Sequence, residues 1–138
     1  MTRTHKQIVY LDMDGTIADL YGQEGWLYGL EHEQKGLFLN CKPLTTEAVV
    51  RAYFPATEYD VRICSMTPKD ASIEYCNIVI AEKNAWLDEH FPSITHRVFM
   101  KYGHNKNLRG CEHHILVDDS EPVRASFKGL ALYPLWLD

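Results

Sequence analysis

The chain has 138 residues, and 14 Lys and Arg against 19 Asp and Glu give it a formal net charge of −5. This length fits one domain, and the scattered basic residues argue against a nucleic-acid polymer as partner, because such binding depends on clustered Lys and Arg. No run approaches the roughly 18 apolar residues of a membrane span, and residues 1–7 lack a signal-peptide core, so we expect no membrane partner and a cytoplasmic location.

The first predicted element is a strand over residues 8–11, an apolar run typical of buried strands in parallel sheets. Two carboxylates, Asp12 and Asp14, follow in alternate positions, and Gly15 then favours a turn. Acids at the carboxyl end of a central strand lie where open α/β sheets bind ligands. The alternative interpretation is a solvated Asp-Gly turn without function.

Residues 17–42 contain no convincing strand, and four glycines divide the segment into short pieces. A short helix is predicted within residues 24–33. The aromatic side chains of this segment either stack on a substrate base or form the segment's own small core. They are Tyr21, Trp26, Tyr28 and Phe38.

The middle of the chain alternates helices and strands. A helix is predicted to begin after a threonine cap at Thr45-Thr46 and to end at Pro55. A strand over residues 60–64 follows, with Ser65 at its carboxyl end. A long helix over residues 71–90 is interpreted as core scaffolding without a chemical role, because its apolar residues draw one stripe. That stripe comprises Ile73, Cys76, Ile80, Leu87 and Phe91, widened by Val79 and Trp86.

A second acidic strand end lies far downstream. After a predicted strand over residues 96–100, an apolar run over residues 115–117 ends in Asp118 and Asp119. Two strands that each carry acids at their carboxyl ends build one site of hard oxygen ligands, which suits Mg²⁺.

The last predicted elements are a helix over residues 123–128 and a strand over residues 130–133. The apolar residues 134–137 then lie either against the domain or against a second subunit of a homodimer. Alternating strands and helices predict an α/β fold with a doubly wound parallel sheet, and a site at its carboxyl edge.

The two acidic segments resemble motifs of the haloacid-dehalogenase-like (HAD) phosphohydrolases. The family's first motif, Asp-x-Asp-Gly-Thr after a strand, stands here as residues 12–16, and its fourth, an Asp-Asp pair after a strand, as residues 118–119. The resemblance implies a single Rossmann-like domain over residues 1–138, with a small cap inserted after the first strand at about residues 17–42.

The two middle motifs are looser. Ser65 matches the second, a small hydroxyl that binds a phosphoryl oxygen, and Thr67 is the fallback. The third is a lysine, for which Lys101 and Lys106 are both candidates. The segment Tyr102-Gly103-His104-Asn105-Lys106 resembles the Tyr-Gly-x-x-Lys pattern of small phage and bacterial members of the superfamily, which favours Lys106.

This resemblance implies an Mg²⁺-dependent phosphomonoester hydrolase with an aspartyl-phosphate intermediate on Asp12. Asp14 would act as general acid and base, and Asp119 would reach the metal through water or orient Lys106. The implied metal site comprises Asp12, Asp14 (by its backbone carbonyl), Asp118 and Asp119. The implied phosphate-binding residues are Ser65, Lys106 and, by backbone N–H groups, Gly15 and Thr16.

The implied substrate is a small phosphorylated molecule, most simply a deoxynucleoside or nucleoside monophosphate, by similarity to 5′-nucleotidases. Two alternatives stay open at this point. One is a 3′-phosphatase acting on polynucleotide ends, and the other is a non-catalytic binding protein with the same fold.

Overall fold

A five-stranded, all-parallel sheet forms the centre of the molecule, in a computed structural model that describes residues 6–137. Most of the segment 1–7, from which the absence of a signal peptide was predicted, lies outside these residues. The strand order is β5-β4-β1-β6-β7. The strands are β1 Gln7–Leu11, β4 Tyr59–Met66, β5 Arg97–Met100, β6 Ile115–Val117 and β7 Leu130–Leu132.

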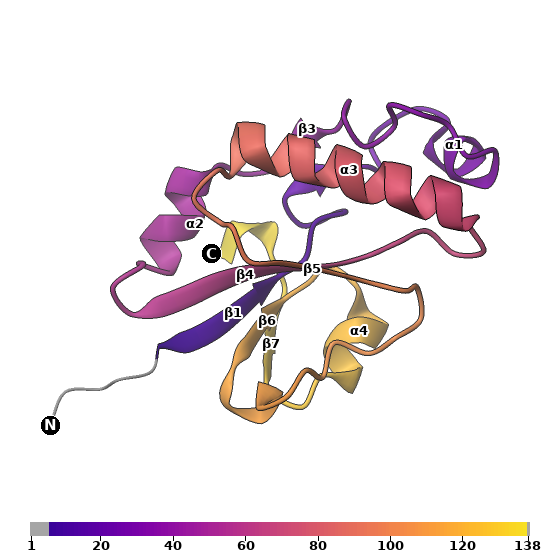
Figure 1. The fold of residues 1–138 in the computed structure, drawn as a ribbon. Helices are drawn as coiled ribbons and strands as arrows, with labels where there is room; N and C mark the ends of the chain where they lie inside the picture. Colours follow the sequence, from indigo (N-terminus) through magenta and orange to yellow (C-terminus); the bar gives the residue numbers. More distant parts are fainter. Residues whose placement is uncertain (1–5, 138) are drawn as a thin grey trace, which may run out of the picture.

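Helices cover both faces of this sheet, so the predicted α/β class and parallel sheet are confirmed (Figure 1). The first three helices lie on one face and α4 on the other, an arrangement compatible with a Rossmann-like fold. The helices are α1 Trp26–Glu31, α2 Glu47–Tyr53, α3 Ile73–His90 and α4 Glu121–Ser126, with short 3₁₀ turns η1 Cys111–His113 and η2 Leu135–Leu137.

The alternation of side chains along the strands divides the core in two. Val9 and Leu11 of β1 pack on the α3 face, whereas Tyr10 between them packs on the α4 face with Leu116 and Phe127. In β4, Val61 and Ile63 share the α3 face, and Ser65 continues the same alternation. The sheet therefore presents different side chains to the two layers at its carboxyl edge.

A short antiparallel ladder closes the segment that follows β1. It joins β2 (Ala18–Asp19) to β3 (Lys42–Pro43), whereas no strand was predicted over residues 17–42. Two-residue strands leave no apolar periodicity, so the pattern could not reveal them. The segment between the two strands contacts α3, since Glu82 accepts hydrogen bonds from the backbone N–H groups of Gly36 (2.7 Å) and Phe38 (3.1 Å).

The prediction for the buried face of α3 was partly wrong. Leu87 is buried as expected, but Ile73 is 78% exposed. The helix instead buries Tyr75 and Lys83, together with Glu82. Two of these side chains are charged and find polar partners beyond the helix, so a count of apolar residues alone could not locate the buried face.

The chain end packs against its own domain. Trp136 donates from Nε1 to the carbonyl of Thr16 (2.8 Å), and Trp136 and Leu137 pack against the core. Trp136 and Leu137 thus take one of the two positions predicted for residues 134–137, whereas Leu135 is 76% exposed. In residues 6–137, no helix is both long and apolar enough to cross a membrane.

Candidate functional site

The first and last acidic segments meet at the carboxyl edge of the sheet. Asp12 follows β1 and Asp118 follows β6, and these strands are hydrogen-bonded neighbours. The ladder continues past the strand ends, because the Asp12 N–H donates to the Val117 carbonyl at 3.0 Å. This is the point where the strand order reverses, and ligands of open α/β sheets bind at such points.

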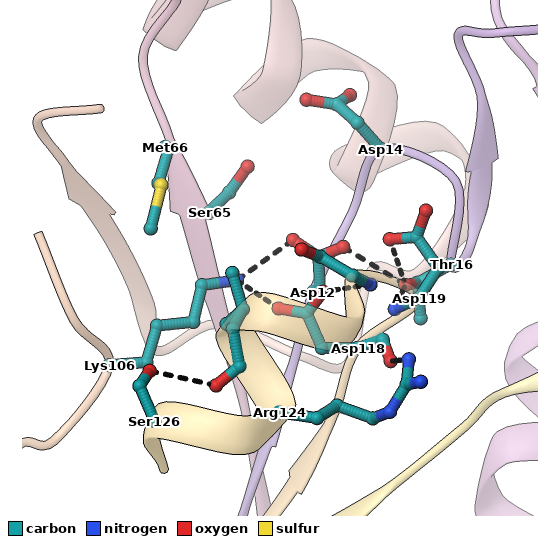
Figure 2. Close-up of polar contacts among 12 residues, drawn as sticks. Asp12, Asp14, Thr16, Ser65, Met66, Lys106, Asp118, Asp119, Arg124 and Ser126 are labelled. Carbon is teal, nitrogen blue, oxygen red and sulfur yellow. Dashed lines mark hydrogen bonds and ion pairs between the residues drawn. The ribbon is translucent and has the colours of Figure 1, made fainter. Parts of the chain in front are cut away.

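Three carboxylates form a compact cluster there. One oxygen from each of Asp12, Asp118 and Asp119 lies within 4.8 Å of the others. The Thr16 hydroxyl lies against two of them, with Oγ1 2.9 Å from Asp12 Oδ2 and 3.3 Å from Asp119 Oδ1 (Figure 2). Hard oxygen donors in this arrangement suit Mg²⁺, so this cluster is the part of the site that could hold a metal ion.

A buried lysine joins two of these acids. Lys106 is only 2% exposed, and its Nζ donates to Asp12 Oδ1 (2.9 Å) and Asp118 Oδ2 (2.7 Å). Burial alone would lower the pKa of Lys106, but the two carboxylates hold it above its ordinary value. The other candidate lysine, Lys101, is exposed and follows the end of β5. The hydrogen bonds of Lys106 go to Asp12 and Asp118 and not to Asp119.

The cluster carries more negative charge than Lys106 offsets. Burial, followed by the charge of Asp12, raises the pKa of Asp118. The same two causes raise the pKa of Asp119 to about 7. A bound divalent cation would relieve this repulsion and reverse the direction of both shifts.

Asp14 does not join the cluster with its carboxylate, which Figure 2 shows pointing away from the three grouped acids. Its Oδ2 accepts a hydrogen bond from Lys83 Nζ at 2.9 Å. Its Oδ1 is buried and has no hydrogen-bond partner among residues 6–137. Burial raises the pKa of Asp14, against the opposing effect of Lys83.

Ser65 is fully buried and lies in β4, which runs two residues beyond the predicted strand end. Its Oγ accepts a hydrogen bond from Lys83 Nζ at 2.8 Å. The fallback Thr67 follows β4, and its N–H donates to the Met100 carbonyl.

The turn after Asp14 uses its own backbone donors. The Gly15 N–H donates to the Ala18 carbonyl (2.9 Å), and the Thr16 N–H to the Met13 carbonyl (3.0 Å). Gly15 has φ +80°, and a Cβ there would collide with the Asp119 carboxylate and the Tyr21 ring. Gly15 and Thr16 therefore shape the site, and the turn itself already uses their backbone N–H groups.

Sequence reasoning missed Lys83. Its position carried a signal, because Val79, Lys83 and Trp86 are separated by four and three residues and so share one helical face. A lysine among apolar residues on an inward face indicates a buried charge that needs a partner.

The aromatic residues after β1 include both buried and exposed side chains. Phe38 is buried, with its ring centroid 4.9 Å from Lys83 Nζ, so it belongs to the packing. Tyr21 is half-exposed beside Gly15 and packs edge-on against Trp26. Tyr28 is exposed and stacks on His32. The Tyr21 ring and the Asp119 carboxylate therefore lie side by side at Gly15.

No protein-family model matches the chain, and no curated protein matches it. The class is therefore defined by fold and site, as an α/β protein with a carboxylate and lysine cluster at the edge of a parallel sheet.

Proposed function

We propose that this protein is a Mg²⁺-dependent phosphomonoester hydrolase of the HAD-like type, acting through an aspartyl-phosphate on Asp12. The observation that carries the proposal is the buried ion pairing of Lys106 with both Asp12 and Asp118. These three residues come from three separate segments and correspond to the first, third and fourth motifs of the resemblance. The proposal includes the finer fold, a doubly wound Rossmann-like domain whose segment 17–42 serves as a small cap.

The proposed reaction brings two negatively charged groups together. A carboxylate nucleophile must approach an anionic phosphate, and like charges 4 Å apart repel by about 4 kcal/mol per unit pair at an effective dielectric of 20. Lys106 contributes positive charge and has used two of its three N–H donors on carboxylates, which leaves the third for a phosphoryl oxygen. Mg²⁺, when bound by the acid cluster, supplies further positive charge next to the transferred group.

The reaction then has two steps. In the first, a carboxylate oxygen of Asp12 bonds to phosphorus, the bond from phosphorus to the leaving oxygen breaks, and Asp14 gives that oxygen a proton. In the second, a water oxygen bonds to phosphorus, the aspartyl-phosphate bond breaks, and Asp14 takes the water's proton. Ser65 holds a phosphoryl oxygen in both steps, and Thr16 orients Asp12 and Asp119.

Measurement of phosphate release from a panel of phosphomonoesters tests this function directly. We expect hydrolysis with Mg²⁺ and none with EDTA, because Lys106 alone does not offset the charge of the acid cluster. A purified, folded protein that hydrolyses no monoester with Mg²⁺ would favour a non-catalytic binding protein instead.

Mg²⁺ should raise the melting temperature, and more so at about pH 8 than at about pH 5.5, since the cation competes with protons for the acids. The folded state holds a proton on Asp119 up to about pH 7, whereas the unfolded chain releases it near pH 4. The stability that this group contributes to the metal-free protein is thus fully present below about pH 4 and is lost as the pH rises from there through about 7. Thermal denaturation with Mg²⁺ or EDTA at both pH values measures the difference, and equal shifts would contradict the proposed cluster.

The proposed substrate is a nucleoside monophosphate. Four acids against two lysines within residues 17–42 make this segment repel a phosphate polymer. The half-exposed ring of Tyr21 lies beside the acids, and stacking on a base is worth roughly 1–3 kcal/mol.

We therefore expect kcat/KM for a deoxynucleoside 5′-monophosphate to exceed that for a 3′-phosphorylated oligonucleotide at both low and moderate salt. Tyr21→Ala should raise KM for the nucleotide about tenfold, with Tyr53→Ala, an exposed tyrosine on α2, as the control. A strong preference for the oligonucleotide that weakens steeply with salt would instead identify a polynucleotide 3′-phosphatase.

A further inference from the structure

A second buried lysine reaches the same edge from the opposite layer. Lys83 lies in α3 and has no exposed surface, and it shares the α3 side of the sheet with Ser65. Lys106, by contrast, pairs with Asp12 and Asp118, which continue the alternation of the strand residues Tyr10 and Leu116 that face α4. The resemblance on which the proposed function rests gives no role to Lys83.

The hydrogen bonds of Lys83 leave no N–H donor of its ammonium free for a phosphate. An ammonium group has three N–H donors, and here all three are used. Nζ donates to Asp14 Oδ2 (2.9 Å), Ser65 Oγ (2.8 Å) and the Met66 carbonyl (2.9 Å). A phosphoryl oxygen could be accommodated only by giving up one of these bonds inside the protein. Lys83 therefore acts through the groups that it holds.

These bonds determine which atoms of Asp14 and Ser65 can donate a proton. Because Lys83 can only donate, Asp14 Oδ2 must accept, and a proton on Asp14 is confined to Oδ1. Oδ1 is the buried oxygen without a partner among residues 6–137. Ser65 likewise accepts from Lys83 with its oxygen, which leaves its own hydroxyl proton to donate elsewhere.

We propose that Lys83 is a positioning residue for proton transfer, which holds Asp14 by Oδ2 so that Oδ1 carries the proton delivered to the leaving oxygen. This inference rests on the proposed function. In the first step the proton leaves Oδ1 as the bond from phosphorus to the leaving oxygen breaks. In the second, the proton of the attacking water returns to Oδ1 as the Asp12-phosphate bond breaks. At the same time Lys83 directs the hydroxyl proton of Ser65 toward a phosphoryl oxygen.

The test compares two leaving groups in Lys83→Met, which keeps an unbranched side chain but removes the ammonium. A nucleoside leaves as a strongly basic alkoxide and needs a proton, whereas p-nitrophenolate leaves without one. kcat/KM reports phosphoryl transfer to the enzyme, and proton donation contributes roughly 10²–10⁴-fold to such a step. We expect Lys83→Met to reduce kcat/KM for a deoxynucleoside monophosphate at least about tenfold more than for p-nitrophenyl phosphate.

Glu82→Gln is the matched control. Glu82 is the neighbouring buried charge on α3. Unlike Lys83, it forms no hydrogen bond with Asp14 or Ser65 but accepts hydrogen bonds from the backbone N–H groups of Gly36 and Phe38. Its replacement should change kcat/KM for both substrates alike. Equal losses for both substrates in Lys83→Met would show a structural role and overturn the inference. If Lys83→Met does not fold, Lys83→Arg is compared in the same way, because its planar fork cannot reproduce three bonds from one nitrogen.

A double variant separates this inference from the proposed function. If Lys83 acts through Asp14, Lys83→Met should cause little further loss on the nucleotide in an Asp14→Asn background, whereas independent effects would multiply. If the loss of kcat/KM depends on the leaving group in Asp14→Asn but not in Lys83→Met, the positioning role of Lys83 is overturned and the proposed function stands. If Asp14→Asn loses kcat/KM equally with both substrates, the acid role of Asp14 is overturned, and the positioning role of Lys83 is overturned with it.

Discussion

Asp12→Asn is expected to reduce Mg²⁺-dependent phosphate release by roughly 10⁴-fold or more, because an amide cannot replace the attacking carboxylate. The side chain keeps its size, and Lys106 keeps its bond to Asp118, so the fold should remain. Initial rates of phosphate release measure the effect, and circular dichroism with thermal denaturation checks the fold.

Asp70→Asn is the matched control for this variant. Asp70 is exposed and has φ +58°, a conformation that asparagine tolerates. The control should hydrolyse phosphomonoesters at the wild-type rate. A folded Asp12→Asn protein with near wild-type turnover would remove Asp12 from the role of nucleophile.

Lys106→Ala should reduce kcat/KM by roughly 10²–10³-fold, the loss usual for a preorganised group that stabilises charge in the transition state. Removal of the ammonium also leaves Asp12 and Asp118 side by side without their shared partner. Since breaking a buried ion pair typically costs about 3–5 kcal/mol, the melting temperature of the metal-free variant should fall as well.

Lys101→Ala gives the comparison that decides between the two candidate lysines. Lys101 is exposed at the end of β5 and should change kcat/KM by less than about twofold. Both variants are assayed at saturating Mg²⁺, where the cation offsets part of the lost charge. Equal losses, or a greater loss in Lys101→Ala, would transfer the motif role to Lys101.

The meeting of Asp12 with Asp118 could be predicted from the sequence for a geometric reason. Each follows a short apolar run, and parallel strands bring their carboxyl ends to one edge. The burial of Lys106 in a loop could not be predicted in this way, because no periodic pattern marks the segment between β5 and η1. Its selection over Lys101 depended on the resemblance.

The two buried charges of α3 could not be predicted from the sequence for a different reason. Apolar periodicity assigns the buried face from apolar residues only, whereas this helix also buries Glu82 and Lys83. Their partners, including Gly36 and Asp14, are far away in the chain, so the pairing exists only in three dimensions. Likewise, the use of the Gly15 N–H inside its own turn follows from tertiary geometry rather than from the motif.

Detection of a phosphoryl group on Asp12 tests the central claim most directly. The Asp14→Asn variant, which should hydrolyse the intermediate slowly, is mixed with p-nitrophenyl phosphate and Mg²⁺, quenched in acid and mapped by peptide mass spectrometry. We expect one phosphoryl group on the peptide that contains Asp12, present with Mg²⁺ and absent with EDTA. Release of p-nitrophenolate with no phosphoryl group on Asp12, or with one on another residue, would contradict the proposed mechanism.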